Sequence, residues 1–168
     1  MISKTDLNKI YEWGLKTKFP LKLAPTTKGY TNKEHSVQKI INDYVCEISE
    51  SENIHYEIDG CSAPTPFFTL ETIAKMFQKL ASGHKVELKR VFNAMASHPL
   101  MVGGTDNFDS IFIKVLKGRG VTKVGGESVR GISLNTDKYG PIGVSIKILG
   151  WPLLKVKSQH LTLFQKMV

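Results

Sequence analysis

Two residues that can do chemistry lie almost side by side in the segment Ile58–Pro66, which reads I-D-G-C-S-A-P-T-P. One glycine separates its carboxylate, Asp59, from its thiol, Cys61. Because each proline fixes φ and removes a backbone donor, the segment predicts a rigid turn and excludes a helix or a central strand. Sites are often built on such turns. Cys61 is then either a ligand or nucleophile or a small buried apolar residue. Asp59 either orients a thiolate ligand, binds an amine group of a substrate, or bonds the turn's own amides.

A lysine in a strand-like segment is the third candidate. Lys123 stands in T-K-V-G-G, where two glycines let a ligand approach the backbone while the ammonium supplies charge. The alternative is an exposed lysine on an edge strand. Two other features stay open as well. Gly103–Thr105 either offers N–H groups to an anion or is a tight connector, and His98 is either a general base or a structural residue before a proline.

Apolar periodicity predicts the elements that position these residues. Helical spacing runs from a cap at Ser36 to Ile48, from a cap at Thr69 to Leu80, and from about Glu87 to His98. Inward residues of the second helix include Leu70, and those of the third include Val91. Met101–Asn107 is expected to be a glycine loop, and Asn107 to cap a short helix that buries Phe108, Ile111, Phe112 and Val115.

Three strand-like segments follow the helices, at Val121–Gly125, Val129–Leu134 and Ile142–Leu149. Their short connections predict an antiparallel meander. Helices followed by a run of strands indicate an α+β fold in which helices pack on one antiparallel sheet.

Length and composition are typical of one globular domain. The chain has 168 residues, of which 41% are hydrophobic and 23% charged. It contains neither the roughly 20-residue apolar run of a membrane span nor the apolar core of a secretory signal, so we expect no membrane partner. The two cysteines stand in dissimilar contexts and do not indicate a disulfide framework, and Cys46 is interpreted as structural. A reducing, cytoplasmic location is therefore predicted.

The net charge of +8 raises the question of nucleic-acid binding. Residues 1–39 carry eight lysines against three acidic residues, so much of the excess lies in the first quarter of the chain. These lysines are single and scattered, without an arginine cluster or interleaved aromatic residues. We therefore interpret them as solvated and expect no nucleic-acid partner.

Ordered motifs carry a family resemblance. They are D-G-C-x-x-P-T-P at Asp59–Pro66, A-M-x-x-H-P-x-M-V-G-G-T-x-x-F-D at Ala94–Asp109, V-x-K-x-G-G-E at Val121–Glu127 and G-x-S-I-K-I at Gly143–Ile148. In this order they closely resemble the L-asparaginase II family, the Rhizobium-type, thermolabile class. Residues 27–38 are similar to that family's segment upstream of the cysteine turn. The resemblance extends over roughly residues 23–148.

The resemblance implies both an activity and roles for the three candidates. Family members hydrolyse L-asparagine to L-aspartate and ammonia through Ser–Lys pairs, on a fold similar to the serine β-lactamases and penicillin-binding proteins. Lys123 matches the strand lysine that supports the serine nucleophile. Cys61 matches a cysteine that holds zinc together with a second cysteine and a lysine. Asp59 matches the acidic residue beside that ligand, with a part in substrate binding.

The resemblance also has a gap. The family's N-terminal half, with its nucleophilic serines and the C-S-x-C-S-G-K-H segment that supplies the other zinc ligands, finds no match. We therefore divide the chain into an unmatched basic segment (1–22), a part like the family's C-terminal half (23–150) and a weakly matched tail (151–168). Two hypotheses follow. One is an asparaginase that is inactive as an isolated chain and works with a separately encoded N-terminal half, with a homodimer left open. The other is a non-catalytic remnant or binding module of the same fold.

Overall fold

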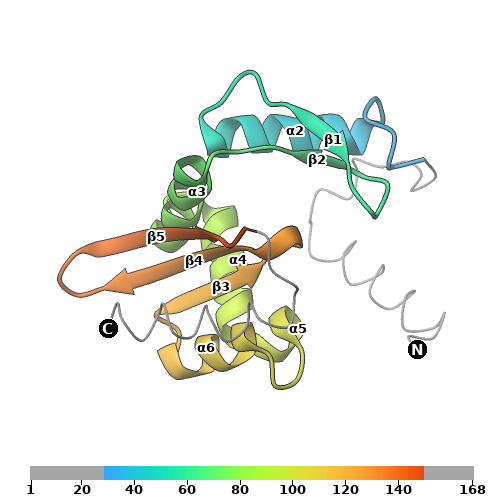
Figure 1. Ribbon diagram of the computed structural model, residues 1–168. Coiled ribbons are helices and arrows are strands. Elements are labelled where there is room, and N and C mark those ends of the chain that lie inside the picture. Colours follow the sequence, from blue (N-terminus) through green and yellow to red (C-terminus); the bar gives the residue numbers. More distant parts are fainter. Residues whose placement is uncertain (1–28, 150–168) are drawn as a thin grey trace, which may run out of the picture. The chain divides into compact units, whose positions relative to one another are not determined.

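The computed structural model describes residues 29–149, so the expectations for residues 1–22 and 151–168 lie outside its described part (Figure 1). The chain divides into two compact units. Of the described residues, the first unit holds 29–47 and 51–67, and the second holds 48–50 and 68–149. The elements are α2 (Ser36–Ser49), β1 (Tyr56–Ile58), β2 (Pro64–Pro66), α3 (Leu70–Ser82), α4 (Val86–Ser97), α5 (Pro99–Gly103), α6 (Phe108–Leu116), β3 (Gly120–Val124), the 3-10 turn η2 (Gly126–Ser128), β4 (Val129–Thr136) and β5 (Gly140–Lys147).

The first unit combines α2 with a two-stranded antiparallel hairpin, β1 with β2. The strand β2 is the segment Pro-Thr-Pro. The sequence excludes a central strand here, as the structure confirms, but the edge strand was not predicted. The bond from Asp59 N–H to Ala63 O closes the hairpin. Alternation along the strand then points the nitrogens of Pro64 and Pro66 away from β1, where a missing N–H breaks no ladder bond.

Tyr56 carries a buried hydroxyl in this unit that has no hydrogen-bond partner among the described residues. Burial, reinforced by the nearby Cys46 thiol, raises the pKa of this hydroxyl. An unpartnered buried polar group costs about 1–3 kcal/mol.

We expect Tyr56→Phe to raise the free energy of unfolding in urea by about 1 kcal/mol. The exposed Tyr44 is the matched control, and its Phe variant should change stability by less than about 0.5 kcal/mol. Destabilisation by Tyr56→Phe would contradict this expectation.

The second unit is built on the predicted antiparallel meander, in which β4 lies between β3 and β5. Helix α3 packs on β4 and β5, and α6 lies beside β3 (Figure 1). As expected from the sequence, Thr69 caps α3, and its hydroxyl accepts a bond from Thr72 N–H at 3.1 Å. Helices packed on a small antiparallel sheet confirm the α+β class.

Small residues form the part of the sheet that α3 covers. We call them the Gly-Ser patch: Gly131, Ser133, Gly143 and Ser145. The strand register pairs each glycine with a serine, so the four residues occupy one face of β4 and β5. Both serine hydroxyls donate to carbonyls of α3 at 2.6 Å, Ser133 to Phe77 O and Ser145 to Leu70 O. The helix is thus held by hydrogen bonds as well as by packing.

The two glycines of this patch set how closely α3 approaches the sheet. A Cβ on Gly143 would lie 1.9 Å from Ala74 O, and one on Gly131 would lie 2.0 Å from the ring of Phe77. Real Cβ atoms do not come that close to other heavy atoms. Glycine is therefore required at both positions because of helix–sheet contact rather than because of an unusual φ.

The apolar core of the second unit lies among α4, α6 and β3. Phe92, Ile113 and Val121 are 6%, 1% and 0% exposed. Partly buried apolar side chains surround them, namely Leu80, Met95, Ala96 and Val102. Because Ile113 and Val121 both belong to this cluster, the core joins α6 to the strand that carries Lys123.

Helix α6 buries only part of the face that was predicted, and Phe112 is 5% exposed as expected. Ile111 and Val115, expected to be buried, are 52% and 69% exposed. The buried residues are Asp109, Ser110, Phe112 and Ile113. The apolar pattern failed here because the two polar residues of the first turn have polar partners inside the protein, which compensate their burial.

Two smaller expectations were also wrong. The glycine loop predicted at Met101–Asn107 begins later, because residues 99–103 form the short helix α5, with Pro99 at its first turn. Val91 and Leu70, expected to face inward, are 47% and 44% exposed.

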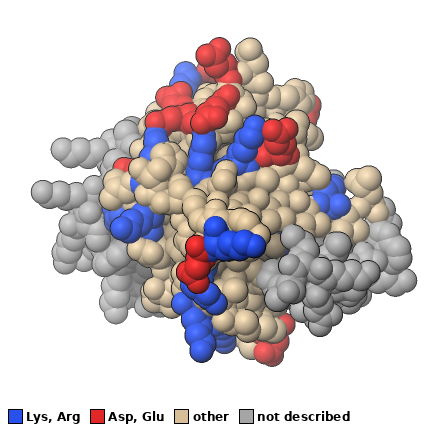
Figure 2. Space-filling model, turned by 90° about the vertical axis from the view of Figure 1, so that its left-hand side faces the viewer, with Lys and Arg blue, Asp and Glu red and all other residues tan. Residues whose placement is uncertain are grey.

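The surface carries charges of both signs. On the face shown in Figure 2, basic and acidic side chains of the described residues lie next to one another at several places. Within residues 29–149, no helix has the length and apolar character that crossing a membrane would require.

Candidate functional site

The turn that holds Asp59 and Cys61 connects β1 to β2. The Asp59 carboxylate accepts bonds from Cys61 N–H (2.7 Å) and Ala63 N–H (3.3 Å) through the same oxygen, Oδ1. Ser62 takes a positive φ of 63°, and its N–H donates to Asp59 O. Asp59 therefore bonds the turn's own amides, as one of the two interpretations predicted. Its second carboxylate oxygen makes no hydrogen bond within the described residues, and the Cys61 side chain is exposed.

These two side chains do not make a metal site on their own. A structural zinc ion takes four ligands, usually thiolates and imidazoles. Among residues 29–149, no group of three or more His, Cys, Asp or Glu side chains is placed to hold a metal ion. The two cysteines do not form a disulfide either. Zinc at Cys61 would need ligands other than the described residues.

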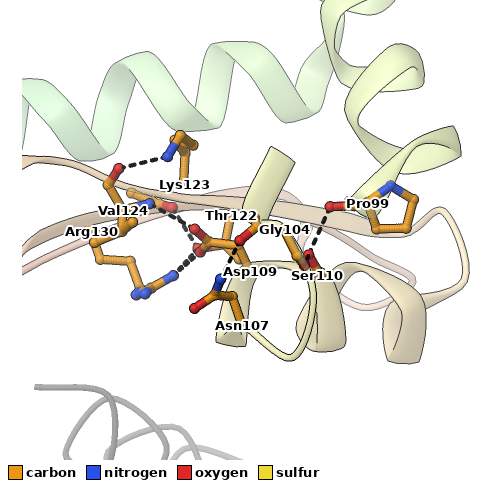
Figure 3. Close-up of polar contacts among 11 residues, drawn as sticks. Pro99, Gly104, Asn107, Asp109, Ser110, Thr122, Lys123, Val124 and Arg130 are labelled. Atoms are coloured by element: carbon orange, nitrogen blue, oxygen red, sulfur yellow. Dashed lines mark hydrogen bonds and ion pairs between the residues drawn. The ribbon is translucent and has the colours of Figure 1, made fainter. Parts of the chain in front are cut away.

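Lys123 lies near the end of β3, in the second unit. Its side chain is exposed, and Nζ donates to Val124 O at 3.1 Å. Lys123 pairs in register with Gly131 and Val124 with Arg130, so Lys123 and Arg130 point to opposite faces of the sheet. Figure 3 shows Lys123 on the other side of the strand from Arg130. Asp59 and Cys61 lie together in the first unit, and Lys123 belongs to the second.

A buried ion pair lies next to this strand end. The Arg130 guanidinium donates to the Asp109 carboxylate, and their side chains are 4% and 3% exposed (Figure 3). Arg130 also donates to Thr122 Oγ1 at 3.1 Å and lies 4.5 Å from the centre of the Phe108 ring. The second carboxylate oxygen of Asp109 accepts the Val124 N–H at 3.2 Å. Helix α6 is thereby tied to the residue that follows Lys123.

The glycine loop before α6 is tightly packed. Ser110 Oγ lies within hydrogen-bond distance of Pro99 O (2.9 Å) and Gly104 O (2.6 Å), and the Asn107 amide donates to Gly103 O. A Cβ on Gly103 would lie 2.7 Å from Ser110 Oγ. These contacts favour the connector interpretation of Gly103–Thr105 over an anion site. Asn107 begins α6 as predicted, but its side chain makes no capping bond.

His98 lies at the junction of α4 and α5. It is exposed and makes no side-chain capping bond at the start of α5. Its N–H donates to Ala94 O, which ends α4 as expected before a proline. Among the described residues, its ring makes no contact that would prepare it to act as a general base.

Sequence reasoning missed Asp109 and Arg130 as partners. In the sequence, Asp109 is only the last residue of a motif, and Arg130 lies inside a strand-like segment. One signal was available: Arg130 is a charged residue at the second position of the apolar run V-R-G-I-S-L. A buried charge requires an opposite charge, and Asp109 is an acidic residue in the first turn of the preceding helix.

Comparison with known proteins supports the resemblance carried by the motifs. The chain finds no match among curated proteins. The family model described as L-asparaginase II matches residues 21–150. This match includes the hairpin turn, the glycine loop, α6 and the whole meander, and it spans more than half of the sequence. The chain therefore belongs to the L-asparaginase II family.

Proposed function

We propose that this chain supplies part of an active site that hydrolyses L-asparagine to L-aspartate and ammonia. The observation that carries the proposal is the family match over residues 21–150, a range that includes Asp59, Cys61 and Lys123. The α+β arrangement is consistent with our further proposal that the second unit corresponds to part of the serine β-lactamase-like fold.

The proposed chemistry has two steps. A serine oxygen attacks the side-chain amide carbon, the C–N bond breaks and ammonia leaves. Water then cleaves the resulting ester and releases aspartate. Lys123 would assist the serine by accepting or returning its proton. The nucleophilic serine would come from the N-terminal half that family members have, because no serine of the matched motifs takes that position in this sequence.

Two other roles follow from the hairpin turn. The Asp59 oxygen that is not bonded to the turn is available to accept a hydrogen bond from the substrate's ammonium group. The Cys61 thiolate would serve as one zinc ligand, with a second cysteine and a lysine from the N-terminal half. Because Asp59 Oδ1 holds the backbone of Cys61 at 2.7 Å, the same carboxylate would also orient the thiol.

A non-catalytic role is the alternative. It is favoured by the surroundings of Lys123, whose Nζ bonds a carbonyl of its own strand and no serine hydroxyl of the described residues. In this case the chain keeps the family's fold as a binding module but carries no hydrolytic chemistry.

The test is ammonia release from L-asparagine. The purified chain is assayed alone and after co-expression with the N-terminal half of a complete family member, in each case with and without added zinc. We expect no release from the chain alone and measurable release from the combined halves. Activity of the chain alone would contradict the need for a second half. No activity in either format would contradict the asparaginase proposal and favour the binding module.

A further inference from the structure

We propose that Asp109 is a positioning residue for Lys123, acting through the backbone of Val124 and held in place by Arg130. The proposal deepens the proposed function, because it rests on Lys123 being the residue that assists the nucleophile. It concerns a pair of side chains that would not themselves touch substrate.

The Asp109 carboxylate bonds the outer edge of strand β3. Gly125 N–H donates to Val129 O, toward β4, at 2.8 Å. Because backbone groups alternate along a strand, the N–H of Val124 points to the opposite, outer edge of β3. The Asp109 carboxylate accepts this N–H at 3.2 Å. The carboxylate therefore replaces the neighbouring strand that β3 lacks on this side and holds the peptide unit that joins Lys123 to Val124.

The Asp109 carboxylate is itself held in place inside the protein. Arg130 binds its other oxygen, and the guanidinium is itself fixed by Thr122 Oγ1 and by the Phe108 ring. Both charged side chains are at least 96% buried. Removing one partner of a buried ion pair is strongly destabilising, because it leaves an uncompensated charge inside the protein. The Asp109 carboxylate therefore cannot turn away from Val124 without leaving a buried charge unpaired.

The Lys123 side chain depends on its backbone for its position. Its side chain is exposed, and within the described residues its ammonium bonds only Val124 O. Since no other described side chain fixes the ammonium, its place relative to a substrate is set by where β3 ends. A displacement of about 1 Å in a reacting group can cost about 100-fold in rate. Holding Val124 is thus a way of holding Lys123.

Ser110 provides a matched control. It is the next residue of α6, it is 1% exposed, and its bonds go to Pro99 O and Gly104 O rather than to β3. Ser110→Ala should therefore loosen the same helix turn without releasing Val124. Asp109→Asn keeps the shape of the side chain but removes its charge and one acceptor. Arg130→Lys is a second variant, which keeps the buried positive charge but loses the guanidinium, whose Nη1 bonds both the Asp109 carboxylate and Thr122 Oγ1.

The experiment has two readouts at a temperature where each variant is folded. In the ¹⁵N-labelled chain, the Val124 amide of Asp109→Asn and Arg130→Lys should exchange with solvent at least about tenfold faster than in the wild type, and the Lys123 Nζ signal should shift. In the combined halves, kcat should fall by about 10–100-fold, with KM within about threefold. Ser110→Ala should lower the melting temperature but leave Val124 exchange and kcat within about twofold.

Several outcomes would overturn the proposal. One such outcome is a folded Asp109→Asn or Arg130→Lys variant in which the Val124 amide exchanges at the wild-type rate and the Lys123 Nζ signal does not shift. This would show that the pair does not hold β3. A kcat loss in Ser110→Ala equal to that in Asp109→Asn would show a merely structural effect. If the wild-type combined halves release no ammonia, the proposed function fails, and the two signals of Val124 and Lys123 still decide whether Asp109 positions the lysine.

Discussion

Gly143→Ala is expected to destabilise the second unit by about 3 kcal/mol or more. The added Cβ would lie 1.9 Å from Ala74 O and 2.3 Å from Gln78 N, which are both backbone atoms of α3. A backbone clash cannot be relieved by a change of rotamer, so the helix must lift from the sheet. Lifting also stretches the bonds from Ser133 and Ser145 to the helix carbonyls. The measurement is the free energy of unfolding in urea, followed by circular dichroism.

Two comparisons make this test specific. Gly131→Ala meets the ring of Phe77 and not a backbone atom, so it should cost about 1–3 kcal/mol, in the usual range of overpacking. Gly126→Ala meets nothing within 4 Å and should change stability by less than about 1 kcal/mol. Equal stabilities for the Gly143 and Gly126 variants would mean that α3 does not lie against the Gly-Ser patch.

Lys123→Ala is expected to lower ammonia release by the combined halves by about 10²–10⁴-fold, the usual contribution of a group that transfers a proton in the reaction. The side chain is exposed and makes no ion pair within the described residues, so its removal should leave the melting temperature within about 2 °C. The loss should appear in kcat. Steady-state kinetics with L-asparagine measures it.

Lys138→Ala is the matched control for this variant. Lys138 is also exposed and lies near the ring of Tyr139, on the connection between β4 and β5. Its removal changes the net charge by the same amount and should leave kcat within about twofold. If the Lys123 and Lys138 variants were comparably active, Lys123 would take no part in the reaction. The family match by itself would not give it a role.

The elements of the fold could largely be predicted because their signals are local. Helical spacing, the cap at Thr69, the stop before Pro99 and the alternation in β4 and β5 all act within a few residues. The class of the fold follows from their order, since helices followed by an antiparallel meander have few ways to pack. The confirmed part of the prediction is therefore the part that depends on neighbours in the chain.

What the sequence did not predict depends on distant contacts. The buried face of α6 is decided by Arg130, 21 residues away from Asp109, and not by the apolar spacing of α6 itself. The Gly-Ser patch was visible as two similar tripeptides, Gly131–Ser133 and Gly143–Ser145, but its meaning appears only when the register pairs them across two strands. Each tripeptide has small residues at its first and third positions, which lie on the same face of a strand. Two such tripeptides in neighbouring strands are a signal that could have predicted a closely packed helix.

For the candidate site, the backbone turn could be predicted from the sequence, but the roles of its residues could not. The turn around Asp59 and Cys61 was predicted from its prolines and glycine, because these residues restrict the backbone directly. The roles of Cys61 and Lys123 came from a resemblance, and no contact within the described residues identifies them. Such roles depend on partner groups, and a pattern of residue types in one segment does not specify those partners.

The hairpin of the first unit has a consequence for how copies of this chain behave at high concentration. Both prolines of β2 present no N–H on the edge away from β1, so this edge cannot donate backbone bonds to another strand. An edge strand with free N–H groups is a site for edge-to-edge pairing between molecules. The Pro-Thr-Pro strand thus opposes β-sheet growth along this edge of the hairpin.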